Sequence, residues 1–291
     1  MLRVLELFAG IGACSKTLEN LGIEHEIVDA VEIDKYAIKS FNAVHGTNFE
    51  TQDITKWNKD IEVDLIMHGS PCQDFSLAGK QAGGDEGSGT RSSLMYETIR
   101  IVGKLRPKFV IWENVKNLLS KKHRHNFDAY LEAMGNLGYT NYYQVLNAKD
   151  YGIPQNRERV FTVSIRKDID KGFEFPLKQE LKLKLKDMLE DEVDEKYYLS
   201  DKMVNYISIN GTGNYKNVDS KINLDITSNY DLNNVVRKYG IFDSEKSKHQ
   251  AGSVYDQDGL APTLDTMQGG WRQPCIEIKN ATKGIVVSER K

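Results

Sequence analysis

The chain has 291 residues, 40% of them hydrophobic and 28% charged, a balance typical of a globular protein with one large domain or one domain plus a smaller one. Its formal net charge of −3 excludes a chain that is basic throughout, so any contact with nucleic acid needs a local basic surface. The three cysteines (Cys14, Cys72 and Cys275) suit neither a disulfide framework nor a zinc site, which predicts a reducing, cytoplasmic compartment and no metal. No apolar run approaches the ~20 residues that cross a bilayer, so no membrane partner is expected.

Short β-rich runs alternate with amphipathic helical stretches over about the first 170 residues. Strands are predicted at 3–8, 26–32, 63–68, 109–113, 142–147 and 159–166, and helices at 15–21, 35–44, 93–105 and 126–137. This alternation predicts an α/β fold with a doubly wound, mostly parallel sheet over residues 1–175. Ligands of such folds bind beyond the carboxyl ends of the strands.

The sequence changes character after Pro176. Residues 181–195 are highly charged and predict a helix, and residues 210–220 are rich in Asn, Gly and Lys, which is typical of a loop. We expect a second, smaller β-rich unit from about residue 180, within a region that spans 176–291.

Residues 5–13 predict a strand that runs into a glycine turn and then a helix. Gly10 and Gly12 allow a tight bend and a close approach of a ligand to the main chain. Glu32 lies 20 residues after Gly12, where the next strand should end, and a carboxylate there accepts hydrogen bonds from a ribose diol. Ser15 and Lys16 occupy the region of the third glycine of a dinucleotide fingerprint. This favours a nucleoside without a pyrophosphate, such as S-adenosylmethionine, over NAD; the alternative is a purely structural turn.

Asp53 is expected to end a third strand, where its carboxylate could hold the amino group of an adenine. The alternative is a cap of a helix or turn, because Thr55 and Trp57 follow it.

The sequence around Cys72 is the most informative segment. A buried strand ends at Gly69, and Pro71 fixes the backbone immediately before the cysteine, which places the thiol at the carboxyl edge of the sheet. A buried, inert thiol is the better interpretation for Cys14. Residues 77–91 are glycine-rich and polar, which predicts a mobile lid beside the thiol; a surface loop is the alternative.

Two further strand ends carry charged side chains. Glu113 ends the strand predicted at 109–113 and should face the same crevice as Cys72. Arg157 and Arg159 stand two residues apart, so extended backbone points both to one face, where they could bind a phosphate or a carbonyl oxygen. The alternative for the two arginines is an ion-paired set with Glu158.

Together these segments resemble the DNA cytosine-5 methyltransferase family of restriction–modification systems. The matching blocks occur in the family's order over about 165 residues: Phe8-Ala9-Gly10-x-Gly12, Glu32, Asp53-Ile54, Pro71-Cys72-Gln73, Gly89-Thr90-Arg91, Glu113-Asn114-Val115 and Gln155-x-Arg157-x-Arg159. The resemblance implies a doubly wound domain that binds S-adenosylmethionine, a small target-recognition domain and double-stranded DNA as partner.

The resemblance also implies roles for individual residues. Cys72 would add to C6 of a cytosine flipped out of the duplex, so that C5 can accept a methyl group. Glu113 would hydrogen-bond N3 and the exocyclic amine, Arg159 would contact O2, and Arg157 would bridge the nucleophile and Glu113. Residues expected to bind the cofactor are Phe8, Gly10, Ile11, Gly12, Glu32, Ile33, Asp53, Ile54, Gly69, Pro71 and Leu94.

The sequence departs from the family near its C-terminus. Residues 252–270 resemble the early recognition segment of the family, but neither an Arg-x-Leu-Thr-like block nor a Gly-Asn-x-Val block follows. We expect either a split enzyme, whose second subunit carries the missing blocks, or a truncated one. Other hypotheses are a tRNA cytosine-5 methyltransferase, a catalytically idle DNA-binding subunit and an NAD-dependent enzyme. The recognition-like segment favours DNA over tRNA, the set of Cys72, Glu113 and Arg159 argues against an idle subunit, and Cys72 has no role in an NAD enzyme.

Overall fold

The computed structural model describes residues 1–71, 85, 87, 89–191, 194, 198, 234–235, 237–240, 253–262, 275–277 and 285–287. The chain forms two compact units. The first comprises Met1–Leu146 and Glu158–Pro176, and the second comprises Asn147–Arg157 and Leu177–Lys291. In the described residues, no helix has both the length and the apolar character of a membrane span.

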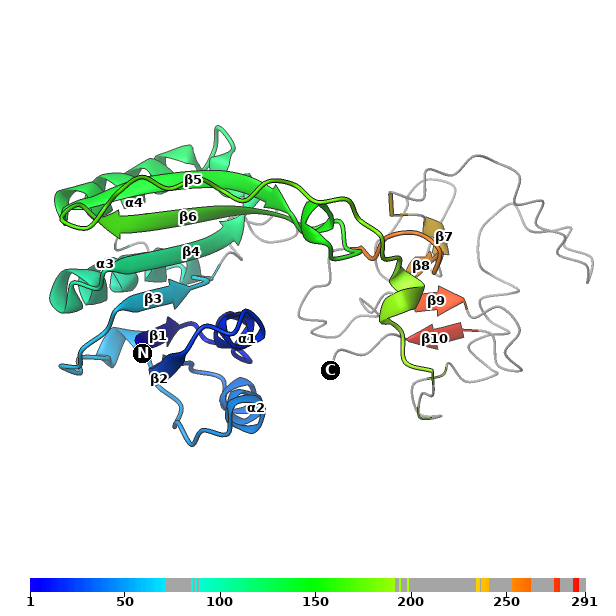
Figure 1. Cartoon of the computed structure of the whole chain (residues 1–291), viewed down its shortest axis with the longest axis horizontal. Coiled ribbons are helices and arrows are strands. Elements are labelled where there is room, and N and C mark those ends of the chain that lie inside the picture. Colours follow the sequence, from blue (N-terminus) through cyan, green and yellow to red (C-terminus); the bar gives the residue numbers. More distant parts are fainter. Residues whose placement is uncertain are drawn as a thin grey trace, which may run out of the picture. The chain divides into compact units, whose positions relative to one another are not determined.

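A six-stranded sheet in the order β2-β1-β3-β4-β6-β5 forms the centre of the first unit (Figure 1). Strands β1, β2, β3 and β4 run parallel to one another, and β6 is antiparallel to β4. The arrowheads of β3 and β4 therefore point to one edge of the sheet and that of β6 to the other (Figure 1). The strands are β1 (Leu2–Leu7), β2 (His25–Val31), β3 (Leu65–His68), β4 (Phe109–Val115), β5 (Tyr139–Asn147) and β6 (Glu158–Arg166).

Helices cover both faces of this sheet. Leu5 and Leu7 of β1 share one buried cluster with Ile101 of α3 and Phe127 of α4, whereas Val4 of β1 packs with Leu18 of α1 on the other face. Alternate side chains of a strand point to opposite faces, so this division identifies a doubly wound sheet. The helices are α1 (Ala13–Asn20), α2 (Lys35–His45), α3 (Met95–Leu105) and α4 (Arg124–Asn136), with short 3-10 helices η1 (Ile54–Lys56), η2 (Arg91–Leu94), η3 (Lys116–Leu119), η4 (Ala148–Tyr151) and η5 (Leu185–Met188).

The second unit contains a small sheet in the order β10-β9-β8-β7. Its strands are β7 (Arg237–Gly240), β8 (Ser253–Tyr255), β9 (Cys275–Glu277) and β10 (Ile285–Val287). β8 is antiparallel to β7 and parallel to β9. The predicted fold class, a mostly parallel α/β sheet with a small β-rich unit after it, is confirmed.

Two local predictions are wrong. Asp53 does not end a strand; its carboxylate caps the 3-10 helix η1, so the alternative given for it, a cap, is confirmed. The helix predicted over residues 181–195 is also absent from the described part of that range, where only the four residues of η5 are helical. Leu181, Leu183 and Leu185 recur every second residue, a spacing that gives no single apolar face to an α-helix. The N–H groups of Leu185 and Lys186 instead donate to carbonyls of residues 259 and 257.

Candidate active site

The turn after β1 presents its main chain to a ligand. Phe8, Gly10 and Gly12 have positive φ angles of 55°, 57° and 83°. A Cβ on Gly12 would overlap the imidazole of His45 and the ring of Phe41, so a larger residue does not fit there. A Cβ on Gly10 would meet no atom within 4 Å, so this residue borders open space. The turn lies at the carboxyl end of β1, where ligands of α/β sheets bind.

Glu32 supports this turn from the end of β2. Its Oε2 accepts a hydrogen bond from the Gly10 N–H at 2.9 Å, and its Oε1 accepts one from the Asp34 N–H at 2.8 Å. Each carboxylate oxygen has a further lone pair, so Glu32 retains capacity to accept from a ribose diol. Ile11 and Ile33 lie beside these residues in the sequence and are 47% and 71% exposed. Exposed apolar side chains around a polar acceptor fit an adenosine-like ligand.

Glu6 explains why this turn suits a nucleoside without a pyrophosphate. Its side chain is 1% exposed, and its Oε1 accepts a hydrogen bond from the Ser15 N–H in the first turn of α1 at 2.8 Å. Burial raises the pKa of the Glu6 carboxyl. A pyrophosphate would need the N–H groups of this helix end, one of which Glu6 already occupies. Sequence reasoning missed Glu6, although a charged residue inside an apolar strand was a signal.

Three other predicted cofactor residues lie on different elements. Asp53 accepts hydrogen bonds from the backbone N–H and hydroxyl of Thr55 at 3.0 and 2.8 Å, and the hydroxyl bond lowers the pKa of its carboxyl. Ile54 is 5% exposed and belongs to the main core. Leu94 is partly buried against the same core. The cofactor roles of these three residues stay predictions.

A buried cluster holds the segment that leads to Cys72. Ser70 is 3% exposed, and its Oγ accepts a hydrogen bond from the indole N–H of Trp112 at 3.0 Å. The side-chain amide of Asn114 donates to the Ser70 carbonyl oxygen at 3.2 Å and approaches its Oγ at 3.4 Å. Because Trp112 and Asn114 are both 1% exposed on β4, they fix Ser70 two residues before the cysteine. Cys72 itself lies outside the described residues, as does most of the predicted lid.

Glu113 and Arg159 form an ion pair at the same end of the sheet. The Nε of Arg159 lies 3.1 Å from Oε1 of Glu113. Glu113 is opposite Phe161, and Val115 is opposite Arg159, so the pair lies diagonally on one face of β4 and β6. The Glu113 side chain is 33% exposed, which leaves it accessible to a ligand.

Gly69 and Pro71 lie close to this pair. A Cβ on Gly69 would lie 3.9 Å from Oε2 of Glu113, so the absence of a side chain keeps the space beside the carboxylate open. Gly69 is exposed and Pro71 is partly buried. The residue after β3, Gly69, therefore lies close to the carboxyl group of Glu113 on β4. This agrees with the expectation that the ends of these two strands face the same crevice.

Arg157 does not continue the strand that holds Arg159. Strand β6 begins at Glu158, and Arg157 belongs to the second compact unit. Its N–H donates to Oδ1 of Asn147 at 3.0 Å, and its carbonyl accepts from Ala148 N–H at 3.1 Å. The predicted bridge from Arg157 to Glu113 therefore stays a prediction.

Cys14 lies in the first turn of α1. It is a free thiol packed against the cluster of Val4 and Leu18. Burial, with further contributions from Glu6 and Glu113, raises its pKa to about 12. The thiolate is the nucleophilic form, so this raised pKa accords with the interpretation of Cys14 as an inert thiol.

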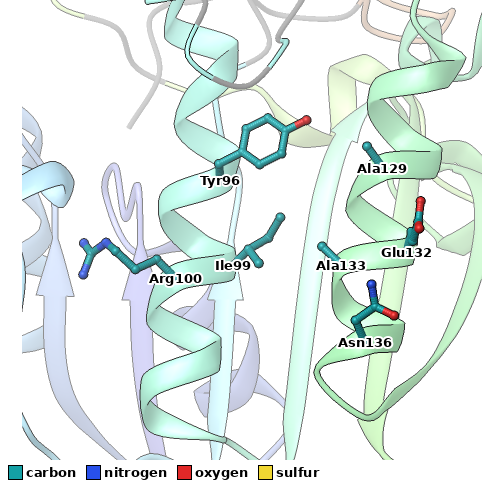
Figure 2. A pocket seen from close by; sticks show the side chains of 7 residues that line it. All are labelled: Tyr96, Ile99, Arg100, Ala129, Glu132, Ala133 and Asn136. Carbon is teal, nitrogen blue, oxygen red and sulfur yellow. The ribbon is translucent and has the colours of Figure 1, made fainter.

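A depression between α3 and α4 lies on another part of the first unit. Figure 2 shows Tyr96 and Ile99 of α3 pointing towards α4, while Arg100, which also lines the depression, extends from the other side of α3. The α4 side chains are Ala129, Glu132, Ala133 and Asn136. None of these is a predicted site residue, and we assign the depression no role in the chemistry.

The fold and site define an α/β enzyme with a nucleoside-binding turn and a carboxylate–guanidinium pair at the carboxyl edge of its sheet. The sequence profile of the family described as C-5 cytosine-specific DNA methylase matches residues 2–289. The chain belongs to this family. The family predicted from the sequence is therefore confirmed, and with it the class of enzyme and its methyl donor, S-adenosylmethionine.

Relatives support this membership. The chain is 35% identical to the orphan methyltransferase M.SPRI of Bacillus phage SPR, over 95% of this chain and 66% of that protein. It is 37% identical to the type II methyltransferase M2.ScrFI of Lactococcus lactis subsp. cremoris, over 70% of this chain and 72% of that protein. Among solved structures, a Spodoptera frugiperda DNMT2 mutant has a TM-score of 0.57 and 25% identity, over 70% of this chain and 64% of that one. The chain thus spans about two thirds of the length of these proteins.

Proposed function

We propose that this chain transfers a methyl group from S-adenosylmethionine to C5 of a cytosine in double-stranded DNA, with Cys72 as the nucleophile. The observation that carries the proposal is the ion pair of Glu113 and Arg159 beside Gly69. This pair brings a carboxylate and a guanidinium close to Gly69, which directly follows β3. A role in protecting DNA in a restriction–modification system accords with the type II relatives.

The residues around the β1 turn fit the methyl donor, which supplies an electrophilic methyl group when bound. Glu32 would accept from its ribose, and Ile11 and Ile33 would cover the adenosine. Asp53 would accept from the adenine amino group through Oδ2, because its Oδ1 already accepts both bonds from Thr55. The ammonium of Lys56 lies 3.7 Å from the same Oδ2. Phe8, Gly12, Ile54, Pro71 and Leu94 would complete the pocket.

The remaining steps belong to the protein's own side chains and the base. The Cys72 thiolate would add to C6, and the electron pair of the C5–C6 double bond would form the new bond from C5 to the methyl carbon. The bond from that carbon to the sulfonium sulfur of S-adenosylmethionine would break in the same step, with S-adenosylhomocysteine as the leaving group. Loss of the C5 proton and departure of the Cys72 sulfur then restore the aromatic ring. Glu113 holds N3 and the exocyclic amine, Arg159 holds O2, and Arg157 bridges Cys72 and Glu113. The base must leave the stacked duplex for this geometry, at a cost of a few kcal/mol.

The second unit would serve target recognition, and a second polypeptide with a Gly-Asn-x-Val block would complete the cofactor pocket. Mixing the chain with a candidate partner and measuring methylation tests it. The proposed reducing, cytoplasmic compartment accords with the free thiol of Cys14.

The direct test is methyl transfer from radiolabelled S-adenosylmethionine to duplex DNA, with the product base identified after digestion. We expect 5-methylcytosine from the wild type, assisted by a partner if one is needed, and none from Cys72→Ser, although this variant still binds S-adenosylmethionine. A Cys72→Ser variant that methylates DNA at a near-normal rate would refute the mechanism. Preference for tRNA over duplex DNA would favour the alternative substrate.

A further inference from the structure

One stretch of this acidic chain is strongly basic. Residues 114–127 contain Lys116, Lys121, Lys122 and Arg124, together with His123 and His125, and no Asp or Glu. The formal net charge of the whole chain is −3. A local concentration of positive charge in such a chain needs a partner that is anionic. We refer to residues 116–125 as the basic segment.

The fold places the basic segment at the edge where the proposed chemistry occurs. It begins directly after β4, which carries Glu113, and continues through η3 into the start of α4. Lys116 pairs with Glu158 at 2.8 Å, and the next residue of β6 is Arg159. Parallel strands β1, β3 and β4 end at this same edge (Figure 1). A duplex that delivers a base to Glu113 must therefore pass close to this segment.

Phosphate groups are bound by lysine and arginine side chains at the protein surface, and the basic segment has such side chains. Lys121 and Lys122 are exposed in the turn before α4. The guanidinium of Arg124 lies 5.5 Å from the ring centre of Phe127 and 5.8 Å from that of Tyr143, which is 41% exposed. Its Nη2 also donates to the Tyr143 hydroxyl at 3.2 Å. Stacking on these rings holds the guanidinium in place at the surface.

A second observation is that His125 of the segment and the adjacent Asn126 contact a carboxylate oxygen of the same chain. Oδ1 of Asp85 lies 2.8 Å from Nε2 of His125 and accepts a hydrogen bond from the Asn126 amide at 2.6 Å. Asp85 is 40 residues away in the sequence, and its side chain is 68% exposed. The donors at the start of α4 thus bind a carboxylate supplied from elsewhere in the chain. A phosphate oxygen has the same charge and accepts the same bonds.

We propose that the basic segment binds the phosphate backbone of the DNA duplex, with Lys121 and Lys122 as phosphate contacts. This inference rests on the proposed function and adds the surface that positions the duplex. Phosphate contacts fix orientation and carry no sequence information, so the segment contributes affinity for any duplex. The acidic residues Asp85, Asp128 and Glu158 pair with His125, Arg124 and Lys116 of the segment.

The test compares duplex binding by the full chain and by two matched double variants. Lys121→Gln/Lys122→Gln removes two charges from the basic segment. Lys167→Gln/Lys171→Gln removes two exposed charges just after the far end of β6, at the opposite edge of the sheet. Fluorescence anisotropy with labelled duplex is measured over a series of salt concentrations, and S-adenosylmethionine affinity is measured by calorimetry for each protein.

We expect Lys121→Gln/Lys122→Gln to bind duplex more weakly and to reduce the slope of log K against log salt by about 1.8, since each phosphate contact contributes about 0.9. The control variant should match the wild type, and all three proteins should bind S-adenosylmethionine equally. An unchanged slope in Lys121→Gln/Lys122→Gln, with wild-type binding and methylation of DNA intact, would overturn this inference alone. A wild type that binds no duplex, or that prefers a structured RNA of equal length, would overturn both the inference and the proposed function.

Discussion

The hydrogen bond from Trp112 to Ser70 allows an effect on stability to be distinguished from an effect on the catalytic rate. Ser70→Ala removes the oxygen that accepts the Trp112 indole N–H at 3.0 Å and that the Asn114 amide approaches at 3.4 Å. Trp112 is 1% exposed, so its N–H would lose its acceptor without gaining access to water. Leaving a buried donor unsatisfied costs about 1–3 kcal/mol. The free energy of unfolding in urea should fall by that amount.

The same variant should also lower kcat. Ser70 precedes Cys72 by two residues, and a displacement of about 1 Å at a reacting group costs about a hundredfold in rate. The matched control is Ser164→Ala, because Ser164 is 1% exposed and its Oγ bonds Oδ1 of Asn141 at 2.6 Å, far along β6. Both variants should lose stability, but only Ser70→Ala should lose kcat at saturating S-adenosylmethionine. Equal kcat values in the two variants would refute the positioning role of Ser70.

Three further predictions concern the other parts of the site. Glu113→Gln, which breaks the pair with Arg159, should lower kcat by about 10²–10³-fold in methyl-transfer assays while S-adenosylmethionine affinity changes little; Glu97→Gln, which breaks the pair with Arg100 on α3, should not lower it. Gly12→Ala should weaken S-adenosylmethionine binding, measured by calorimetry, far more than Gly10→Ala. Both substitutions introduce a backbone strain of about 1–2 kcal/mol, but only a Cβ at position 12 overlaps His45 and Phe41. Burial lowers the pKa of His68 to about 3, below its unfolded value of about 6.5, so its neutral form stabilises the fold above pH 6.5 and that contribution is lost as the pH falls towards 3. His68→Gln should therefore reduce the decline of the free energy of unfolding between pH 6.5 and pH 3. An unchanged decline would contradict the lowered pKa of His68.

Much of the first unit could be predicted because its elements follow local rules. Each predicted strand there matches an observed strand to within a few residues, since its apolar run and the turn after it belong to one segment of sequence. The Glu113–Arg159 pair was predicted only as two charges near one crevice. Their contact depends on the register of β4 and β6, which a sequence does not contain.

The failures have two origins: local hydrogen bonds at Asp53, and contacts between distant residues at Ser70 and at residues 181–191. Ser70 was not recognised because its partners Trp112 and Asn114 lie on the neighbouring strand, more than forty residues away. No strand ends at Asp53, because its hydrogen bonds to Thr55 cap η1 and compete with an extended backbone at that point. The segment 181–191 lacks the predicted helix because its N–H groups bond residues 257 and 259.

The central claim, that Cys72 attacks C6 of a cytosine, is tested most directly by isolating the covalent adduct. Duplex DNA that carries 5-fluorocytosine in place of cytosine accepts the thiol and the methyl group, but fluorine at C5 cannot leave as a cation, so the sulfur–C6 bond persists. Mass spectrometry of the digested complex should locate the modified base on the peptide that contains Cys72, and only when S-adenosylmethionine is present. Methylation of ordinary cytosine by this protein with an adduct on Cys14 or Cys275, or with no adduct, would contradict the account.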